Sequence, residues 1–567
     1  MSKLSNIVLF VCVCAVFFLA GCATMAPLSR GAHPDAGGEG EIPDKPVMTF
    51  EPASTPGDAL AESTGTNLRV NQDSSGRDQN ETTIAINPTD SNNIIGGAND
   101  ARSGSWAAGY YVSHDGGRSW RDGTMPDTKY AKQGDPVVAF CGDGTALFAY
   151  LDYTNAWQPH RLVVARSTDG GDTWLSPGTV YEGSAPFADK PWLACASSGG
   201  RYGNRAYISW THISLSGVIR TAWSSDHGVT WQGATDISGS GVQGSVPVAG
   251  RDGLVYIVWH AGGSIRFAKS TDGGSNWSSA RTVAAINSIG STSFRRNSFP
   301  TAGLDRSGGD YDGNLYAAWS EQRDGDPDIY FTRSTDGGVT WSTPIRVNDD
   351  AVGNGLDQFF PWMAVDDHGN IHLMWHDRRD DPKNKKMQVY IATSRDGGVS
   401  FDRNLRVTDV ASDGALTNFL GDYAALAAWD GKIVPLWSDL RAGTGEEDVY
   451  IEMEEAFDYD IVSGVSFGAD KTTISFDDQE PRLGSAVVYD LIRGDVSDLS
   501  GASPWSNAEC VSENLNAPPG RLADLPDPGR AFYVLIRAQG PRGKGSFGSG
   551  SSHPDSRDAL DATPPCN

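Results

Sequence analysis

The sequence predicts an all-β protein, with a seven-bladed β-propeller followed by a small β-sandwich. Three observations lead to this prediction. Glycine accounts for 67 of the 567 residues, and many short apolar runs end in Gly, Asp or Asn, which is typical of strands joined by tight turns. One turn motif recurs six times at intervals of 46 to 64 residues. A sequence that matches the last strand of the repeat also occurs by itself, before the first complete repeat.

The N-terminal segment has the features of a targeting signal. Lys3 precedes an apolar run over residues 7–19, and Leu19-Ala20-Gly21-Cys22 follows. This arrangement resembles the signal peptide and lipobox of bacterial lipoproteins, which implies cleavage after residue 21 and lipidation of Cys22. Ala23 after the cysteine implies the outer membrane in enteric-type sorting. An uncleaved membrane anchor is the alternative, although the apolar run is short for a stable span.

A flexible linker is expected over residues 22–65, because this segment is rich in Pro, Gly, Ala and Glu and has almost no aromatic residues. Export to an oxidising compartment would make the remaining cysteines disulfide partners. They fall into two pairs, which predicts the bridges Cys141–Cys195 and Cys510–Cys566. Free buried thiols are the alternative.

The recurring motif is Ser-x-Asp-x-Gly-x-x-aromatic, known as the Asp box. Its aspartates are Asp115, Asp169, Asp226, Asp272, Asp336 and Asp396. Asp bonds backbone N–H groups two residues on and tolerates left-handed geometry, and Gly supplies positive φ. We therefore interpret the Asp box as a turn device, because a catalytic group is not normally needed six times.

A longer repeat of four short strands surrounds each box. A seventh unit over residues 423–451 lacks both the box and a fourth strand, while Leu68-Arg69-Val70-Asn71 resembles the fourth strand Ile345-Arg346-Val347-Asn348. The N-terminal strand is thus expected to complete the last blade and close the ring. This predicts seven blades over residues 66–455, with six as the alternative count. Residues 456–567 have a different strand pattern that resembles a fibronectin type III-like sandwich.

The Asp boxes and the blade pattern resemble the sialidase superfamily, or BNR-repeat proteins. The resemblance implies a propeller whose active members use an arginine triad, a Tyr–Glu nucleophile pair and an Asp acid/base, with the first arginine in an Arg-Ile-Pro motif. The corresponding strand openings here are Asn80-Glu81-Thr82, Asp135-Pro136, Lys190-Pro191, Val246-Pro247, Phe299-Pro300, Phe360-Pro361 and Asp422-Tyr423. None reads Arg-Ile-Pro, and sialidases have six blades. Both departures argue against sialic acid hydrolysis.

A ligand site is expected at one mouth of the propeller channel, which is lined by the loops entering each inner strand and by those between second and third strands. Tyr423 stands where sialidases place their nucleophile. A neighbouring carboxylate could activate it, with Glu81, Glu321 and Asp422 as the candidates. Asp135 or Asp189 could act as general acid. Alternatively, Tyr423 is a packed aromatic residue of the inner strand. The candidate ligand-binding residues are Arg77, Arg295, Arg296, Asp357, Asp377, Arg378 and Asp422.

The pattern Trp-x-acid-x-Arg occurs at Trp319, Trp375 and Trp437, and its repetition favours a structural ion pair. No cofactor is expected, although Asp324, Asp326 and Asp328 could bind a structural calcium ion.

The formal charge of −26 excludes nucleic acid as a partner and disfavours anionic glycans unless a local basic site overrides it. Two functions follow for a cell-envelope protein that is expected to be a monomer. The first is a glycoside hydrolase of sialidase-like type, with a polysaccharide lyase less favoured. The second is a non-catalytic scaffold or adhesion lipoprotein that binds carbohydrate or protein. The identity of the glycan does not follow from the sequence.

Overall fold

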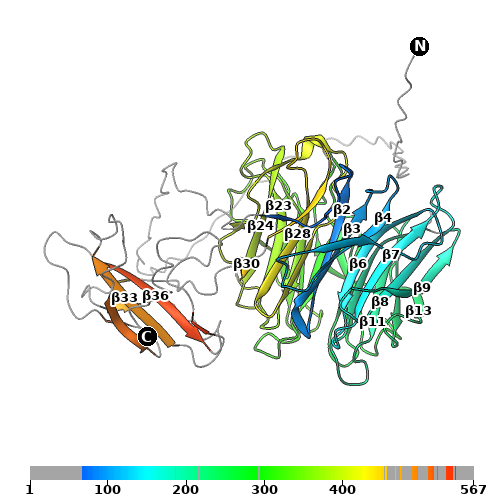
Figure 1. Ribbon diagram of the computed structural model, residues 1–567. Coiled ribbons are helices and arrows are strands. Elements are labelled where there is room, and N and C mark those ends of the chain that lie inside the picture. Colours follow the sequence, from blue (N-terminus) through cyan, green and yellow to red (C-terminus); the bar gives the residue numbers. More distant parts are fainter. Residues whose placement is uncertain are drawn as a thin grey trace, which may run out of the picture. The chain divides into compact units, whose positions relative to one another are not determined.

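The computed structural model describes residues 67–452 except 186, 214–215 and 292–293, and after them only short strands (Figure 1). Seven four-stranded antiparallel sheets are arranged as blades around a common axis, which confirms the predicted seven-bladed propeller. Helix is almost absent from this part of the chain, where the 3-10 turn η1 (Gly414–Leu416) is the one such element. The expected signal segment, Cys22 and most of the linker lie outside the described residues.

Each blade runs outward from its innermost strand, and the chain enters every inner strand at the same mouth of the channel. Blades 1 to 3 are β2 (Gln79–Asn87), β3 (Asp90–Asp100), β4 (Ala107–Ser113) and β5 (Arg121–Thr124); β6 (Lys132–Phe140), β7 (Ala146–Tyr153), β8 (His160–Ser167) and β9 (Leu175–Gly183); and β10 (Phe187–Cys195), β11 (Ala206–Ile213), β12 (Val218–Ser224) and β13 (Gln232–Asp236).

Blades 4 to 6 follow the same order, with a short extra strand β26 (Ser412–Asp413) beside β24. They are β14 (Gln243–Ala249), β15 (Val255–His260), β16 (Ser264–Ser270) and β17 (Arg281–Ala285); β18 (Thr301–Leu304), β19 (Leu315–Glu321), β20 (Asp328–Ser334) and β21 (Ile345–Arg346); and β22 (Gln358–Val365), β23 (Ile371–Asp377), β24 (Lys386–Ser394) and β25 (Leu405–Arg406).

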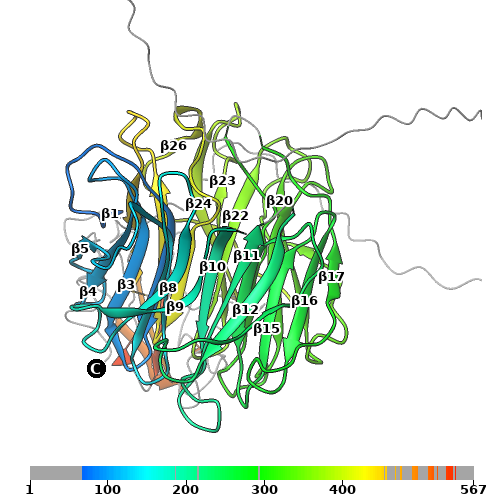
Figure 2. The same cartoon turned by 90° about the vertical axis from the view of Figure 1, so that its right-hand side faces the viewer.

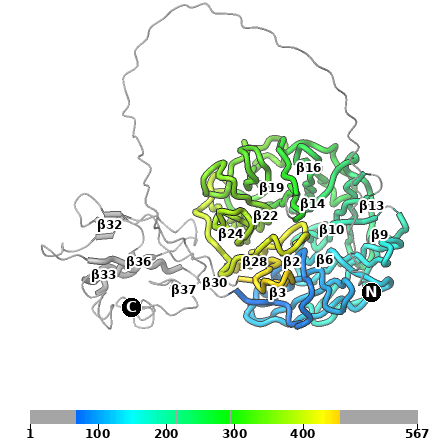
Figure 3. Tube along the Cα trace, turned by 90° about the horizontal axis from the view of Figure 1, so that it is seen from above, coloured from blue at the N-terminus to red at the C-terminus, as the bar shows by residue number. Residues whose placement is uncertain are grey.

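Blade 7 is built from both ends of the propeller sequence, as predicted. Its strands are β27 (Ala425–Trp429), β28 (Lys432–Asp439), β29 (Asp448–Ile451) and the N-terminal β1 (Leu68–Arg69), with β30 (Glu454–Glu455) beside β28. Leu68 pairs with Ile451, and Arg69 pairs with Tyr450. Figure 3 shows the consequence from above, where the yellow β28 lies beside the blue β2 and the ring is closed.

Apolar side chains fill the spaces between neighbouring blades. The second strands place Trp210, Trp259, Trp319, Trp375 and Trp437 at equivalent positions, and all five are fully buried. Strand alternation explains this, because every second residue points toward the adjacent blade and β-branched or aromatic side chains pack well there. Each blade is therefore held mainly by contacts with its two neighbours, so the ring must be closed. Strand β1 contributes to this closure because it completes blade 7, and Val70 beside it packs in the core between blades 7 and 1.

The Asp boxes have the predicted structural role. In blade 5, Ser334 Oγ accepts a hydrogen bond from Gly338 N at 2.9 Å, and Asp336 Oδ1 accepts one from Thr340 N at 2.9 Å. Gly337 and Gly338 have φ of 69° and 81°, a region that favours glycine. Asp336 is exposed, and the hydrogen bonds from Thr340 lower its pKa to about 2. The carboxylate is thus used within its own turn.

The predicted bridge between Cys141 and Cys195 is present and joins the residue directly after β6 of blade 2 to the last residue of β10 in blade 3. Cys566, one partner of the second predicted bridge, lies outside the described residues. In the C-terminal segment, two small sheets have the orders β31-β32-β35 and β34-β33-β36-β37. Their strands are β31 (Ser466–Phe467), β32 (Thr473–Ser475), β33 (Val488–Asp495), β34 (Glu509–Leu515), β35 (Gly520–Arg521), β36 (Phe532–Gly540) and β37 (Gly543–Lys544). Within the described ranges, no helix has the length and apolarity to span a bilayer.

Candidate active site

Five of the seven inner strands carry a β-bulge just inside the channel mouth. In blade 2, Gly134 pairs with Leu151 and Val137 with Ala149, so Asp135 and Pro136 together face one residue. A bulge of this kind bends the strand and re-aims a side chain. We call the first bulged residue of each blade its ring position. The register places Glu81, Asp135, Lys190, Gly244 and Phe360 at the ring positions of blades 1, 2, 3, 4 and 6. In blades 5 and 7 the corresponding residues are Phe299 and Tyr423, which lie two residues before the first paired residues of β18 and β27.

Four ring positions hold a non-glycine residue in the left-handed region. Glu81, Asp135, Lys190 and Phe360 have φ between 49° and 56°, and Gly244 has φ of 64°. Such geometry costs about 1 kcal/mol or more for each non-glycine residue, and it is concentrated at functional sites. The alignment of blade 4 from the sequence was wrong by two residues, because the register puts Gly244 and not Val246 at the ring position.

Polar contacts link the charged ring positions in a closed circuit around the mouth. Glu81 accepts hydrogen bonds from Asp422 N at 3.2 Å and from Asn99 Nδ2 at 2.8 Å. Asn99 Oδ1 in turn accepts one from Asp135 N at 2.7 Å. Asp135 Oδ2 accepts one from Lys190 N at 3.0 Å. The Lys190 ammonium completes the circuit, since Nζ lies 2.9 Å from Asp422 Oδ2.

Two cations and four carboxyl groups meet in this cluster. Lys190 Nζ also contacts Asp189 Oδ2 at 2.8 Å, and Arg295 contacts Asp422. Lys190 and Asp422 are buried, whereas 39% of the Arg295 side chain is exposed. Arg295 is therefore the part of the cluster that solvent reaches most easily.

The surroundings push the pKa values of these acids apart. Burial acts to raise the pKa of Asp422, but Lys190 and Arg295 outweigh it and hold that pKa below its usual range. Burial and the charge of Asp189 raise the pKa of Asp135 to about 6. Burial, Asp135 and Asp422 raise the pKa of Glu81 well above its ordinary value. The pKa of Asp422 is thus shifted toward the carboxylate form and that of Glu81 toward the protonated form, and such a division suits acid and base roles.

Tyr423 lies beside these acids. Within the described residues its hydroxyl is buried and has no hydrogen-bond partner. Its ring packs edge-on against Trp192, with centroids 5.2 Å apart, and lies 6.2 Å from the ring of Trp362. Burial and the charges of Glu81 and Asp135 raise the pKa of Tyr423 well above 10. The ring of Tyr423 is therefore packed, as the alternative hypothesis expected. Its hydroxyl nevertheless lies beside two acids without a hydrogen-bond partner among the described residues, and it is protonated at neutral pH.

Sequence reasoning did not identify Asn99 or Glu447, which support the cluster. Glu447 is 1% exposed and accepts hydrogen bonds from Asn80 Nδ2 at 2.8 Å and Thr417 Oγ1 at 2.9 Å. Burial raises its pKa to about 8. Asn99 Nδ2 contacts Asn80 Oδ1 at 3.1 Å, so Glu447 is joined to the mouth through two amides. Neither residue belongs to a repeated motif, so the sequence offers no signal for them. The role of Glu447 is seen only from its buried position beside blade 1.

The other predicted ligand residues lie outside the circuit. Asp357 pairs with both Arg296 and Arg378, and all three are buried. Asp377 accepts hydrogen bonds from Trp375 Nε1 at 2.7 Å and Arg379 Nε at 2.9 Å, as in the repeated structural pair. Arg77 is exposed in the segment before β2.

The further acids that the sequence proposed are also engaged elsewhere. Glu321 is held by Trp319 and Arg323. In the possible calcium segment, Asp324 accepts a hydrogen bond from Tyr330 and Asp328 pairs with Arg346. Within the described part, the carboxylates and imidazole that lie close enough to share an ion are instead those of Asp366, Asp367 and His368. Asp366 is already bonded to Asn370 and His372.

Comparison with solved structures finds matches of low sequence identity. A Dyadobacter fermentans protein of unknown function is 15% identical, with a TM-score of 0.39 over 55% of this chain and 93% of its own. The α-L-arabinofuranosidase of Fusarium graminearum in complex with arabinobiose is 14% identical, with a TM-score of 0.37 over 56% and 92%. The NanB sialidase of Streptococcus pneumoniae is 12% identical, with a TM-score of 0.37 over 68% and 70%. No family model and no curated protein matches the chain. The site is therefore interpreted from its own residues.

Proposed function

We propose that this protein binds a glycan at the channel mouth and hydrolyses a glycosidic bond there. One observation carries the proposal. Glu81 and Asp135, on strained bulges of adjacent blades, are hydrogen-bonded acids with raised pKa values beside the unpaired hydroxyl of Tyr423. An acid that keeps its proton, a carboxylate that can take one and a hydroxyl nucleophile are the groups that a retaining glycosidase of the tyrosine type needs.

The proposed roles follow from the positions of these groups and from the directions of their pKa shifts. Glu81 gives its proton to the leaving-group oxygen as the glycosidic bond breaks. Tyr423 Oη attacks the anomeric carbon, and its proton passes to Asp135, because the raised pKa of the phenol makes a resting phenolate unfavourable. Water then attacks the anomeric carbon while the Glu81 carboxylate takes its proton. The bond to Tyr423 Oη breaks, and Asp135 returns a proton to that oxygen. Arg295 would contact the substrate, since it is the exposed cation of the cluster.

A second candidate, glycan binding without turnover, is favoured by the contact between the two acids. Glycosidase carboxyl pairs are about 5–9.5 Å apart, whereas Glu81 and Asp135 are directly hydrogen-bonded. Catalysis would require substrate to separate them. Without that separation the mouth is a polar binding surface with two shielded cations.

A panel of fluorogenic glycosides together with a glycan array distinguishes the two candidates. The hydrolase predicts turnover of at least one glycoside, lost in Y423F and in E81Q with the fold intact by circular dichroism. The matched control is D310N, which removes an exposed carboxylate from the connection between β18 and β19, beyond the end of the inner strand that lies away from the mouth. Array binding with no turnover would reject hydrolysis and leave the binding protein.

We also propose that the protein is an exported lipoprotein of the outer membrane, anchored through Cys22. The bridge between Cys141 and Cys195 supports this location, because structural disulfides persist in oxidising compartments. Metabolic labelling with a palmitate analogue tests it. Label should be incorporated in the wild-type protein and absent from C22A, and equal labelling of both would contradict the proposal.

A further inference from the structure

Blade 4 lacks a structural element that the three following blades share. In blades 5 to 7 the buried tryptophan of the second strand donates its indole N–H to an acid two residues later. Trp319 Nε1 lies 3.0 Å from Glu321, Trp375 Nε1 lies 2.7 Å from Asp377, and Trp437 Nε1 lies 2.8 Å from Asp439. An arginine two residues beyond the acid neutralises each carboxylate. The carboxylate therefore satisfies a buried donor and a cation together.

In blade 4 the acid is replaced by Ala261 and the arginine by Gly263. Trp259 is fully buried, and within the described residues its Nε1 has no hydrogen-bond partner. A buried N–H without a partner is unfavourable, so an acceptor would be bound favourably at this position. In blade 4 this position lies just past β15, which ends at His260, and the small side chain of Ala261 leaves space beside Trp259.

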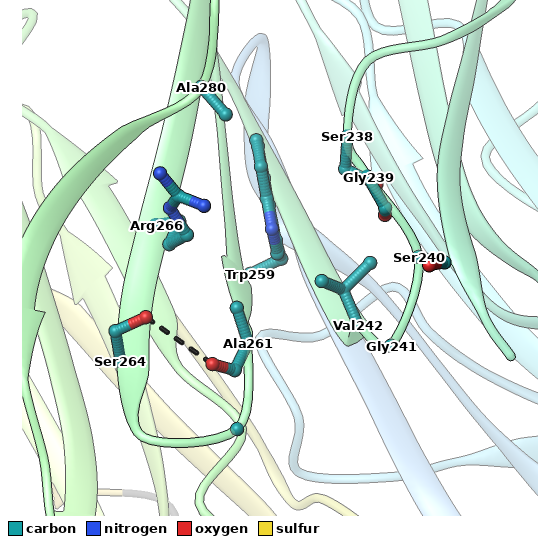
Figure 4. A pocket seen from close by; sticks show the side chains of 11 residues that line it. Ser238, Gly239, Ser240, Gly241, Val242, Trp259, Ala261, Ser264, Arg266 and Ala280 are labelled. Atoms are coloured by element: carbon teal, nitrogen blue, oxygen red, sulfur yellow. Dashed lines mark hydrogen bonds between the residues drawn. The ribbon is translucent and has the colours of Figure 1, made fainter.

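That space is a cavity of about 240 Å³ between blades 3 and 4, two blades that run side by side in Figure 2. Figure 4 shows Trp259 between Arg266 and the segment that carries Ser238 and Gly239. Ala261, Ser264 and the exposed Gly262 form the rim toward the β15–β16 turn. The cavity is smaller than the roughly 300–1,000 Å³ of sites for drug-sized ligands, which suits one charged group or one sugar ring.

Arg266 supplies the positive charge. It stands opposite Trp259 in the β15–β16 ladder, where blades 5 to 7 have Tyr330, Tyr390 and Tyr450. Its guanidinium lines the cavity, its Nε is buried without a partner, and it forms no ion pair with any described carboxylate. Arg266 and Trp259 both line this cavity, and their unpartnered N–H groups are donors that suit a carboxylate.

Blade 3 shares the indole without a partner, because Trp210 Nε1 also has none among the described residues, but its arginine is engaged. There the equivalent arginine, Arg220, pairs with Asp236 at 2.7 Å. His212 takes the place of the missing acid, and its ring lies 6.5 Å from that of Trp210. The cation is thus neutralised within the chain and the space beside the tryptophan is occupied.

We propose that the blade 4 cavity binds the carboxylate of an acidic sugar, which takes the position that Glu321, Asp377 and Asp439 occupy in their blades. The choice of a sugar rests on the glycan function proposed above, because the loops before β14 and between β15 and β16 lie on the same face as the channel mouth. The chain leads from Val242 in the cavity wall to Gly244, the blade 4 ring position. Arg266 is then a local basic site that overcomes the overall charge of −26.

The test measures binding of D-glucuronate, D-galacturonate, acetate and neutral D-glucose to the full-length protein by calorimetry and ligand-observed NMR. Saturable binding of at least one sugar acid is expected, with no binding of glucose. R266M and W259F should each weaken it at least tenfold. R220M, the matched change in blade 3, should leave it unaltered.

A261D provides the sharpest variant, because it restores the internal carboxylate. It should abolish binding of the sugar acid and raise the melting temperature, which also shows that the protein is folded. E81Q should leave this binding intact, so failure of the proposed hydrolysis and failure of the blade 4 site are separable. Absence of saturable binding by every acid, or binding unchanged in A261D, would overturn the proposal. If acetate binds and neither sugar acid does, the assignment of the ligand as an acidic sugar is overturned.

Discussion

The Lys190 ammonium lies 2.9 Å from the carboxylate of Asp422 and joins blade 3 to blade 7, two blades that are not neighbours in the ring. The pair therefore spans the channel mouth. Both residues are buried, and both also bind a second charge, since Lys190 contacts Asp189 and Asp422 contacts Arg295. The candidate site is held by charges from opposite parts of the ring and not by a single blade.

Replacing Lys190 with methionine should destabilise the propeller strongly. Removing one partner of a buried ion pair leaves an uncompensated charge and typically costs about 3–5 kcal/mol. The double variant K190M/D422N should recover much of that loss, because the amide carries no charge. Urea unfolding at pH 7 measures both values. A loss below about 1 kcal/mol in K190M would mean that Arg295 alone suffices to hold Asp422.

The buried Glu447 predicts a pH dependence of stability. Its pKa is about 8 in the folded state, against an ordinary value of 4.5. Between these pH values the folded protein holds a proton that the unfolded chain has released, so the free energy of unfolding decreases as pH rises through this window. At about 1.4 kcal/mol per pKa unit, the full difference amounts to at most about 4–5 kcal/mol.

The variant E447Q isolates this contribution, because the amide cannot titrate and Thr417 can turn its hydroxyl to accept. E447Q should be more stable than the wild type at pH 9, while the two should approach each other near pH 5. The control is E446Q, which alters the adjacent, less buried acid and should retain the wild-type slope. Parallel stability curves for E447Q and the wild type from pH 5 to 9 would show that Glu447 ionises without cost.

The blades, the ring closure and the Cys141–Cys195 bridge could be predicted from the sequence because each depends on a repeated local pattern. Strand alternation, the glycines of the Asp box and the match between residues 68–71 and 345–348 are all visible in the chain. In the structure that match extends to side chains. Asn71 Oδ1 accepts from Val449 N at 3.0 Å, and Asn348 Oδ1 accepts from Ile329 N at 2.8 Å.

This equivalence predicts equal effects for the two asparagines. N71A and N348A each leave a buried backbone N–H unsatisfied and should each lower the free energy of unfolding by about 2 kcal/mol. Deletion of residues 66–73 should cost far more, because it also removes the buried Val70 and opens the ring. Thermal unfolding compares the three variants. A deletion no worse than N71A would show that β1 does not close the ring.

Removal of the disulfide should also destabilise the propeller. The bridge closes a loop with a sequence separation of 54, for which chain entropy gives about 4 kcal/mol. C141S/C195S should therefore unfold at lower denaturant concentration than the oxidised wild type, while the reduced wild type should match the double variant. A stability unchanged by reduction would contradict an entropic role for the bridge.

The candidate site was less predictable because its contacts join different blades. The sequence identified Tyr423, Glu81, Asp135, Asp189 and Asp422 as mouth residues, and the structure brings them together. The sequence could not reveal that bulges with left-handed backbone geometry re-aim Glu81, Asp135 and Lys190, because the backbone φ of a strand residue depends on the sheet register. Asp377 illustrates the reverse case. Its place in the mouth loops suggested a ligand contact, but Trp375 and Arg379 use its carboxylate.

The most direct test of hydrolysis at the channel mouth is the pH dependence of kcat/KM for whichever glycoside is turned over. Asp135 must be ionised to act as base, so the rate should rise with pH through a limb near pH 6. D135N should lower kcat by at least about 100-fold and remove that limb, while D310N keeps both rate and profile. Turnover by D135N with an unchanged limb near pH 6 would contradict the assignment of the active site.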